Sequence, residues 1–203
     1  NVNRQYTASH PSLDFAGSVI DGRGSIPWVA FAERNPQSTQ LSDIFVKRFV
    51  QEAGHEYWQS VGVNVSTGDQ PLPSLNMDTH QPAANPILAA GGTTPNALEL
   101  LPWVVWEENW GSTLDGRSQR QIFVRRAIPA SGGNVMGGYR WTPVGQYYGN
   151  SVRSLNVITL RDATHPDMVF SGPDNTEAWV VWQESEPTPP PYSVQPTPIS
   201  FLR

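Results

Sequence analysis

The heptapeptide PWVVWEE at Pro102–Glu108 decides how this chain is expected to fold. It sets two Trp and two Val side by side and ends on two carboxylates, and close variants occur at Pro27–Glu33 (PWVAFAE) and Ala178–Glu184 (AWVVWQE). Apolar residues occupy both alternating sets of positions, whereas a strand with one face in water alternates apolar and polar residues. The three segments therefore predict short β-strands that are covered on both faces.

Other short segments repeat around these three in a fixed order. Each is preceded by one of HPSLDFAG, NPILAAGG and HPDMVFSG, and the first two copies are followed by DIFVKRF or QIFVRRA, by YWQSVG or RWTPVG, and by PSLN or RSLN. The interval from Ile44 to Ile122 leads on to Ser200, so SFLR at the end of the chain is predicted to match IFVK and IFVR. The chain is thus expected to contain two full copies of one unit and part of a third.

Four short strands per unit, with central strands buried on both faces, are typical of the blades of a β-propeller. The fold class predicted is all-β, with two complete four-stranded blades, a third partial blade, and a ring that this chain alone does not close. A β-sandwich is the competing fold, but it does not require the same segments in the same order. The predicted boundaries are unit 1 at 1–63, a linker at 64–84, unit 2 at 85–145, a linker at 146–164, and a partial unit 3 at 165–203 with a proline-rich segment at 186–198.

Composition narrows the classes of function. The formal net charge is −5 and no run of Lys and Arg stands out, which argues against nucleic acid as a partner. No apolar run reaches the length of a membrane span, so no membrane insertion is expected. The chain has no Cys and therefore neither disulfides nor thiolate chemistry. Because it begins at Asn1 rather than Met, we expect a processed product or a piece of a longer protein.

The repeated segments resemble those of bacterial secreted propellers of the sialidase-like (BNR-like) superfamily. The resemblance covers nearly the whole chain up to Glu186 and concerns the order of segments, which implies a fold and not a chemistry. The Asp boxes of that superfamily, S-x-D-x-G-x-x-W, are absent, and its catalytic residues match no positions here. The resemblance implies an extracellular or cell-surface protein, with no catalytic residue carried over.

Repetition separates structural residues from candidate functional ones. Glu33, Glu108 and Glu184 end the same strand in every copy, so we interpret them as structural, bound to backbone N–H groups or to basic residues of a neighbouring unit. The tryptophans that recur are likewise interpreted as core between units: Trp28, Trp58, Trp103, Trp141 and Trp179, with Trp106 and Trp182 matching Phe31. His10, Asn85 and His165 share one position before Pro and are expected to form a turn ahead of the first strand of each unit.

The candidate ligand-binding residues are those without a repeat partner: Glu107, Asn109, Trp110, Tyr147 and Tyr148. Glu107 corresponds to Ala32 and Gln183, and Trp110 is expected in a polar loop between two strands, where binding residues are often found. No spacing of His, Cys and carboxylates indicates a metal site, and no cofactor motif is present.

Three functions remain open. The first is a non-enzymatic, secreted or surface-displayed propeller segment that binds or scaffolds, with a carbohydrate or a protein as ligand. The second is a self-assembling structural subunit in which other copies, or the remainder of a longer chain, complete the blades. The third is a fragment of a propeller glycoside hydrolase, whose catalytic residues lie elsewhere.

Overall fold

The computed structural model describes residues 7–18, 25–34, 42–63, 74–78, 81–92, 99–112, 118–131, 135–145, 147–148, 151–152, 154–157, 161–185 and 199–202. In these ranges the regular structure is β-strand apart from one short 3₁₀ helix, η1 (Pro173–Asn175), so the all-β prediction is confirmed. No helix within this part of the chain is long and apolar enough to span a bilayer. The proline-rich segment 186–198 lies outside the described residues.

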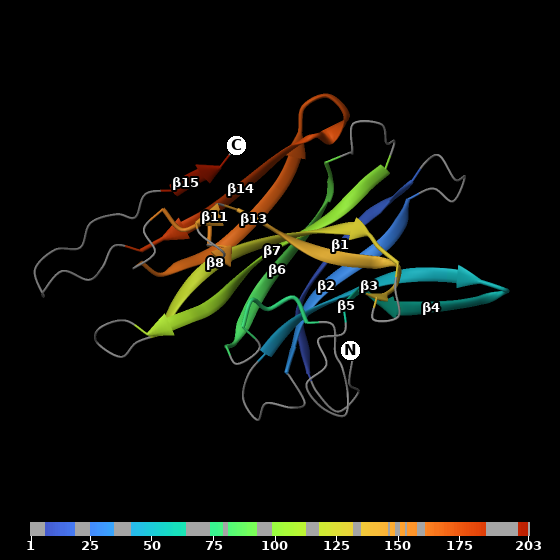
Figure 1. Ribbon diagram of the computed structural model, residues 1–203, viewed down its shortest axis with the longest axis horizontal. Coiled ribbons are helices and arrows are strands. Elements are labelled where there is room, and N and C mark those ends of the chain that lie inside the picture. Colours follow the sequence, from blue (N-terminus) through green and yellow to red (C-terminus); the bar gives the residue numbers. More distant parts are fainter. Residues whose placement is uncertain are drawn as a thin grey trace, which may run out of the picture.

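The strands form three antiparallel meanders in chain order, which we call units 1, 2 and 3. Unit 1 contains β1 (Ala8–Ser18), β2 (Ile26–Arg34), β3 (Ser42–Glu52) and β4 (His55–Ser60). Unit 2 contains β6 (Ala83–Gly91), β7 (Glu99–Ser112), β8 (Ser118–Pro129) and β10 (Tyr139–Val144). Unit 3 contains β13 (Ala163–Ser171), β14 (Glu177–Glu184) and β15 (Ile199–Leu202). Figure 1 shows units 1 and 3 at opposite ends of the molecule, with most of unit 2 between them.

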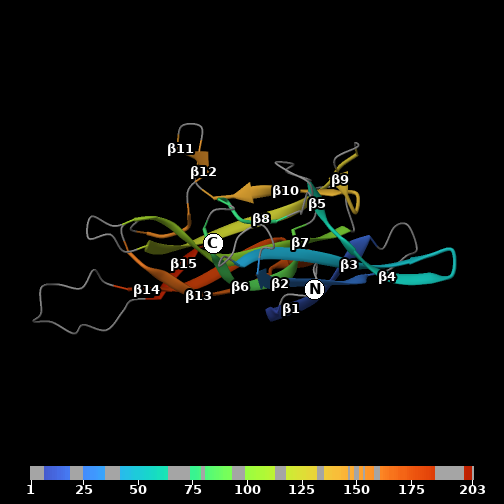
Figure 2. The same cartoon turned by 90° about the horizontal axis from the view of Figure 1, so that it is seen from below.

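Units 1 and 2 are joined at their edges as well as by stacking. The end of β1 pairs with the start of β7 through Gly17 and Leu100, which makes one eight-stranded sheet. The short strands β5 (Gly62–Val63) and β9 (Val135–Met136) add a second bridge between the two units, whereas β11 (Tyr147–Tyr148) pairs with β12 (Ser151–Val152). The sheet curls as a result, as the view from below shows (Figure 2). Sequence reasoning expected separate sheets and did not predict this edge pairing.

Strand register identifies equivalent residues and corrects one alignment. Ala32 pairs with Ile44 in unit 1 and Glu107 with Ile122 in unit 2, while Gln183 pairs with Ile199 in unit 3. The residue equivalent to Ile122 is therefore Ile199, and the prediction of Ser200 was wrong by one position. A shift of one residue turns every side chain of a strand to the other face, so the backbone pairing with β14 is what decides the register.

β2 and β7 have buried residues on both faces, as predicted from PWVVWEE, whereas β14 buries only the face of Val180 and Trp182 and leaves Gln183 on the other face exposed, against the prediction. Val104 and Trp106 pack into one apolar cluster with Trp28 of unit 1, and Val105 packs into a second cluster with Met168 of unit 3. We call the face of a unit that turns toward the next unit its forward face, and the opposite one its rear face. Because side chains alternate along a strand, Trp28 and Trp103 lie on forward faces, and Val104 and Trp106 on a rear face.

The repeated position before Pro forms a bulge inside each first strand. His10, Asn85 and His165 have φ values of 50°, 51° and 52°, and the pairing register shifts between Ser9 and Ser12, Ala84 and Ile87, and Thr164 and Asp167. The prediction of a turn ahead of the strand was therefore wrong. Asn and His tolerate positive φ better than most residues, and one extra residue bends the strand without ending it.

A side-chain clasp attaches each linker to the third strand of the unit before it. In the first linker, Leu75 N donates to Ile44 O at 2.8 Å, and Ile44 N donates to Asn76 Oδ1 at 2.9 Å. Asn76 Nδ2 donates to Gln81 O at 2.9 Å and to Asp43 Oδ1 at 3.1 Å. The Asn76 side chain thus accepts the backbone hydrogen bond that an adjacent strand would otherwise accept, and Asn76 is buried.

The second linker repeats this clasp. Leu155 N donates to Ile122 O at 2.8 Å, Ile122 N donates to Asn156 Oδ1 at 2.9 Å, and Asn156 Nδ2 donates to Arg161 O at 2.9 Å. Residues 74–76 and 154–156 of the two linkers are therefore fixed to the unit that precedes them.

We expect Asn76→Ala to lower the free energy of unfolding by about 2–3 kcal/mol, because it leaves the buried Ile44 N–H without an acceptor. Asn156→Ala should have a similar effect, since the clasp is the same. Urea unfolding followed by tryptophan fluorescence measures both variants. Gln51→Ala, at an exposed residue, serves as the control and should stay within about 0.5 kcal/mol of the wild type. Equal losses in all three variants would contradict a specific role for the clasp.

Candidate functional site

The repeated glutamates continue the clasps from one unit to the next. Glu108, fully buried at the end of the apolar run in β7, accepts hydrogen bonds from Asp78 N at 2.7 Å and Met77 N at 2.8 Å in the linker that follows unit 1. Its Oε2 also accepts a bond from Trp106 Nε1 at 2.8 Å. This carboxylate therefore holds the linker of unit 1 against the rear face of unit 2.

Glu184 makes the same connection between units 2 and 3. Its Oε2 accepts bonds from Val157 N at 3.0 Å and from Trp182 Nε1 at 3.4 Å, and the side chain is buried. Glu33 is also buried at the equivalent position. The prediction that the repeated glutamate binds backbone N–H groups is thus confirmed for Glu108 and Glu184.

Burial changes the protonation of Glu108. Removal from water raises the pKa of Glu108 to about 7, although three N–H donors and the nearby Arg125 guanidinium favour the carboxylate. The same burial lowers the pKa of Arg125, whose Nη2 lies 3.3 Å from Met77 Sδ. Both groups serve the contact between units 1 and 2, so this perturbed pKa belongs to a structural contact.

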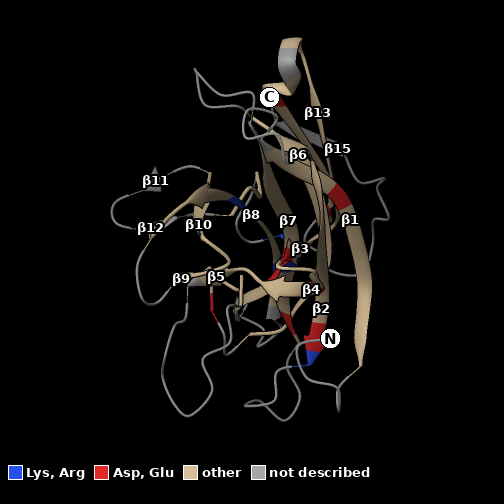
Figure 3. Cartoon of the chain, turned by 90° about the vertical axis from the view of Figure 1, so that its right-hand side faces the viewer, with Lys and Arg blue, Asp and Glu red and all other residues tan. Residues whose placement is uncertain are grey.

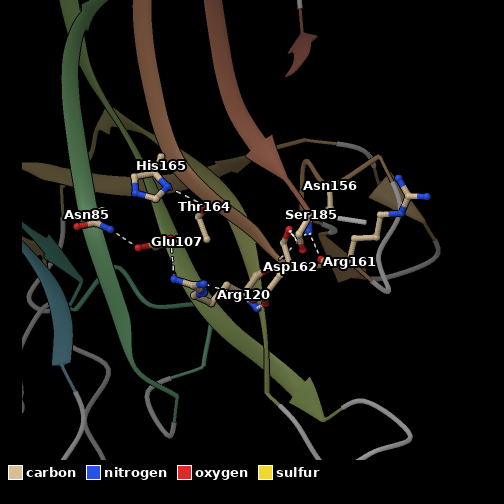
Figure 4. Close-up of polar contacts among 9 residues, drawn as sticks. All are labelled: Asn85, Glu107, Arg120, Asn156, Arg161, Asp162, Thr164, His165 and Ser185. Atoms are coloured by element: carbon tan, nitrogen blue, oxygen red, sulfur yellow. Dashed lines mark hydrogen bonds and ion pairs between the residues drawn. The ribbon is translucent and has the colours of Figure 1, made fainter. Parts of the chain in front are cut away.

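Glu107 lies in a polar cluster between units 2 and 3 (Figure 4). It is buried, accepts a hydrogen bond from Asn85 Nδ2 through Oε1, and forms an ion pair of 3.8 Å between Oε2 and Arg120 Nη1. Arg120 continues to Asp162 in unit 3, with a backbone bond of 2.7 Å and an ion pair of 3.3 Å. Thr164 and His165 of β13 border the same cluster. The structure thus gives Glu107 a place in the contact between two units, and its role in ligand binding remains a prediction.

Asn109 and Trp110 are on a strand and not in the predicted loop. β7 continues to Ser112, and Asn109 and Trp110 pair in unbroken register with Arg120 and Gln119. The prediction of a loop was wrong because the pairing with β8 extends beyond the apolar segment. Asn109 N donates to Pro82 O at 2.9 Å, which ties it to the start of unit 2.

Strand alternation separates the predicted site residues. Glu107 and Asn109 lie on the forward face of unit 2, while Trp110 lies on the rear face. The indole of Trp110 packs against Phe123 with ring centroids 5.5 Å apart and is 39% exposed. The structure therefore does not bring Glu107 and Trp110 together into one contact surface.

Tyr147 and Tyr148 form the short strand β11, away from the long strands of unit 2. Their backbones pair with Val152 and Ser151 of β12. Their side chains lie outside the described residues, so the predicted binding role of this pair stays a prediction.

Five of the seven recurring tryptophans belong to the two apolar clusters between units, as predicted, whereas Trp179 and Trp58 do not. Trp28, Trp106 and Trp182 are buried, and Trp103, Trp141 and Trp179 are half-buried. Trp58 is 42% exposed, against the prediction, although it is equivalent to Trp141. Trp141 Nε1 donates to Val61 O of unit 1 at 3.2 Å, and no earlier unit among the described residues covers Trp58.

Leu13 and Phe15 are exposed on the same rear face of unit 1, at 55% and 52%. We call the surface formed by Leu13, Phe15 and Trp58 the rear end face. Beside it lies a hollow of about 360 Å³ lined by Pro11, Phe31 and Lys47 among others. Sequence reasoning did not select Leu13 and Phe15, although their alignment with Met168 and Phe170 of unit 3 was already visible.

Neither charged side chains nor metal-binding groups indicate a second candidate site among the described residues. Figure 3 shows isolated acidic and basic residues on strands that are largely uncharged. Within the described ranges, no three side chains of His, Cys, Asp and Glu come together in a way that could hold a metal ion. Many of the residues that repeat are used in contacts between units, and the rear end face departs from that pattern.

Comparison with family models, with curated proteins and with solved structures finds no match for this chain. The resemblance to sialidase-like propellers therefore stays a prediction.

The raised pKa of Glu108 predicts a pH dependence of stability. The group holds its proton more tightly in the native state than in the unfolded chain, so its contribution is complete below about pH 4.5 and is lost as the pH rises through about 7. The free energy of unfolding of the wild type, measured relative to Glu108→Gln, should fall by about 2 kcal/mol between pH 5 and 8. Urea titrations across this range measure it.

The control for this series is Gln51→Ala, at an exposed residue that carries no titratable group. Its difference from the wild type should not change over the same range of pH. A difference between wild type and Glu108→Gln that stays constant, or grows as the pH rises, would contradict the assignment.

Proposed function

We propose that this chain is a non-enzymatic scaffolding and binding protein built from propeller-type blades, two complete and one partial, which other material completes. Its ligand is a protein that seats on the rear end face of unit 1. An extracellular or cell-surface location accompanies this proposal.

The observation that carries the proposal is the different burial of equivalent residues. Leu88 in unit 2 and Met168 in unit 3 are covered by the preceding unit, whereas Leu13 at the same position is exposed. Likewise Trp141 reaches a carbonyl of the preceding unit, whereas Trp58 is exposed. An exposed group of apolar residues with a neighbouring hollow is typical of a protein contact site.

The arrangement of carboxylates supports a non-enzymatic function over a glycoside hydrolase. Glycosidases place two carboxyl groups about the same bond, whereas Glu107 and Glu108 point to opposite faces of β7. Glu108 is also occupied by two backbone N–H groups. A carbohydrate ligand is the alternative, which the half-exposed ring of Trp110 favours, since an indole face can stack on a sugar.

The rear end face should bind the dye 8-anilinonaphthalene-1-sulfonate in the native state, because its apolar residues are in contact with water. Phe15→Lys combined with Trp58→Ala should remove most of the gain in dye fluorescence. The matched control, Val157→Lys, alters another exposed apolar residue, outside the rear end face, and should retain it. Native protein that does not bind the dye, or equal binding by all variants, would remove the support for this surface.

A glycan array and a set of chromogenic glycosides separate the alternatives. We expect no turnover of the glycosides and no glycan binding by the wild type, since Glu107, Glu108 and Glu184 are engaged in contacts between units. Glycan binding that Trp110→Ala abolishes would favour a carbohydrate as the ligand over a protein. Turnover that Glu107→Gln abolishes, while Glu56→Gln retains it, would show that the protein is a glycosidase.

A further inference from the structure

The contact between units 2 and 3 depends on a ring that sits over a glycine. Phe170 on the rear face of unit 3 lies against Gly91, and a Cβ atom added at Gly91 would overlap its ring. The ring also meets Trp103 edge to face, with centroids 5.4 Å apart. Any larger residue at position 91 would therefore displace the phenylalanine from this contact.

The contact between units 1 and 2 has a different combination at the same positions. Ala90 replaces the phenylalanine and Ala16 replaces the glycine, while Tyr139 packs edge-on against Trp28 with centroids 5.2 Å apart. In this contact, backbone N–H groups of β6 donate to side chains of unit 1: Leu88 N to Ser12 Oγ at 2.9 Å and Ala90 N to Asp14 Oδ2 at 2.8 Å. Residue size is thus matched across each contact between units.

The rear face of unit 1 resembles that of unit 3 rather than that of unit 2. Leu13 and Phe15 occupy the positions of Met168 and Phe170. A forward face like that of unit 2 therefore fits this surface.

The forward face of unit 3 differs from that of unit 2 at the position of the glycine that Phe170 covers. Ser171 is the equivalent of Gly91, and its Oγ accepts a bond from Trp179 Nε1 at 2.6 Å. Phe15 of a second copy, placed as Phe170 is placed over Gly91, would overlap the Cβ atom of Ser171. Stacking of identical chains head to tail is therefore blocked by this serine, although Val169 beside it is 61% exposed.

From these contacts we propose that the rear end face binds one kind of partner: a β-sheet unit of the same repeat type, with glycine at the position of Gly91. Phe15 seats over that glycine and Trp58 donates to a backbone carbonyl, as Trp141 does to Val61. This inference rests on the proposed function, since it names the partner for the same surface. Residue 171 then excludes the chain's own copies from that surface.

A variant of this chain can serve as such a partner. Ser171→Gly places a glycine on unit 3 at the position of Gly91, and Phe15→Lys in the same chain prevents its own rear end face from binding. Wild type mixed with the Ser171→Gly, Phe15→Lys variant should form a complex of one copy of each, measured by sedimentation velocity. Wild type alone, and the variant alone, should sediment as single chains at the same concentrations.

The control is Ser171→Ala with Phe15→Lys, which loses the bond to Trp179 but retains the Cβ atom. This control should not bind wild type. The single variant Phe15→Lys should likewise not bind the Ser171→Gly, Phe15→Lys variant, because it lacks the phenylalanine ring. No complex with the glycine variant, an equal complex with the alanine variant, or association of wild type alone would overturn the inference. Near-ultraviolet circular dichroism of each variant confirms that it is folded, and dye binding by wild type tests the surface separately, so that the failure of each proposal can be distinguished.

Discussion

The structure depends on buried polar side chains that replace a missing strand partner. The edge of the third strand in units 1 and 2 would leave backbone groups unpaired, and a buried N–H without an acceptor is costly. Asn76 and Asn156 accept those N–H bonds, and Glu108 and Glu184 then bind the residues that follow. The clasps of units 1 and 2 are therefore linked to the units that follow them through Glu108 and Glu184.

The repeat made most of the fold predictable. Apolar residues at both alternating sets of positions in PWVVWEE predicted a strand covered on both faces, and β7 is buried in that way, whereas β14 buries one face only. Register was less predictable, since the end of the chain offered no pattern to choose between Ile199 and Ser200. The bulges at His10, Asn85 and His165 were missed because a polar residue before Pro also signals a turn.

The candidate site was harder to predict because a residue's face depends on where its strand ends. Glu107 and Trp110 are close in sequence, and a loop would have allowed them to converge. β7 instead continues to Ser112, so the two side chains point in opposite directions. The absence of a repeat partner identified residues that differ between units, but some of these differences serve a particular contact, as Glu107 does with Arg120.

Burial in a repeat is decided by neighbours as much as by residue type. Phe15 and Phe170 are the same residue at the same position of their units, yet Phe170 lies over Gly91 and Phe15 is 52% exposed. Hydrophobicity alone would let Phe15 associate with any apolar surface, including a second copy of the chain. Close packing is more selective, because one Cβ atom at residue 171 is enough to prevent the ring from seating. Faces that differ by one small residue can therefore keep copies of this chain apart while still accepting a different partner.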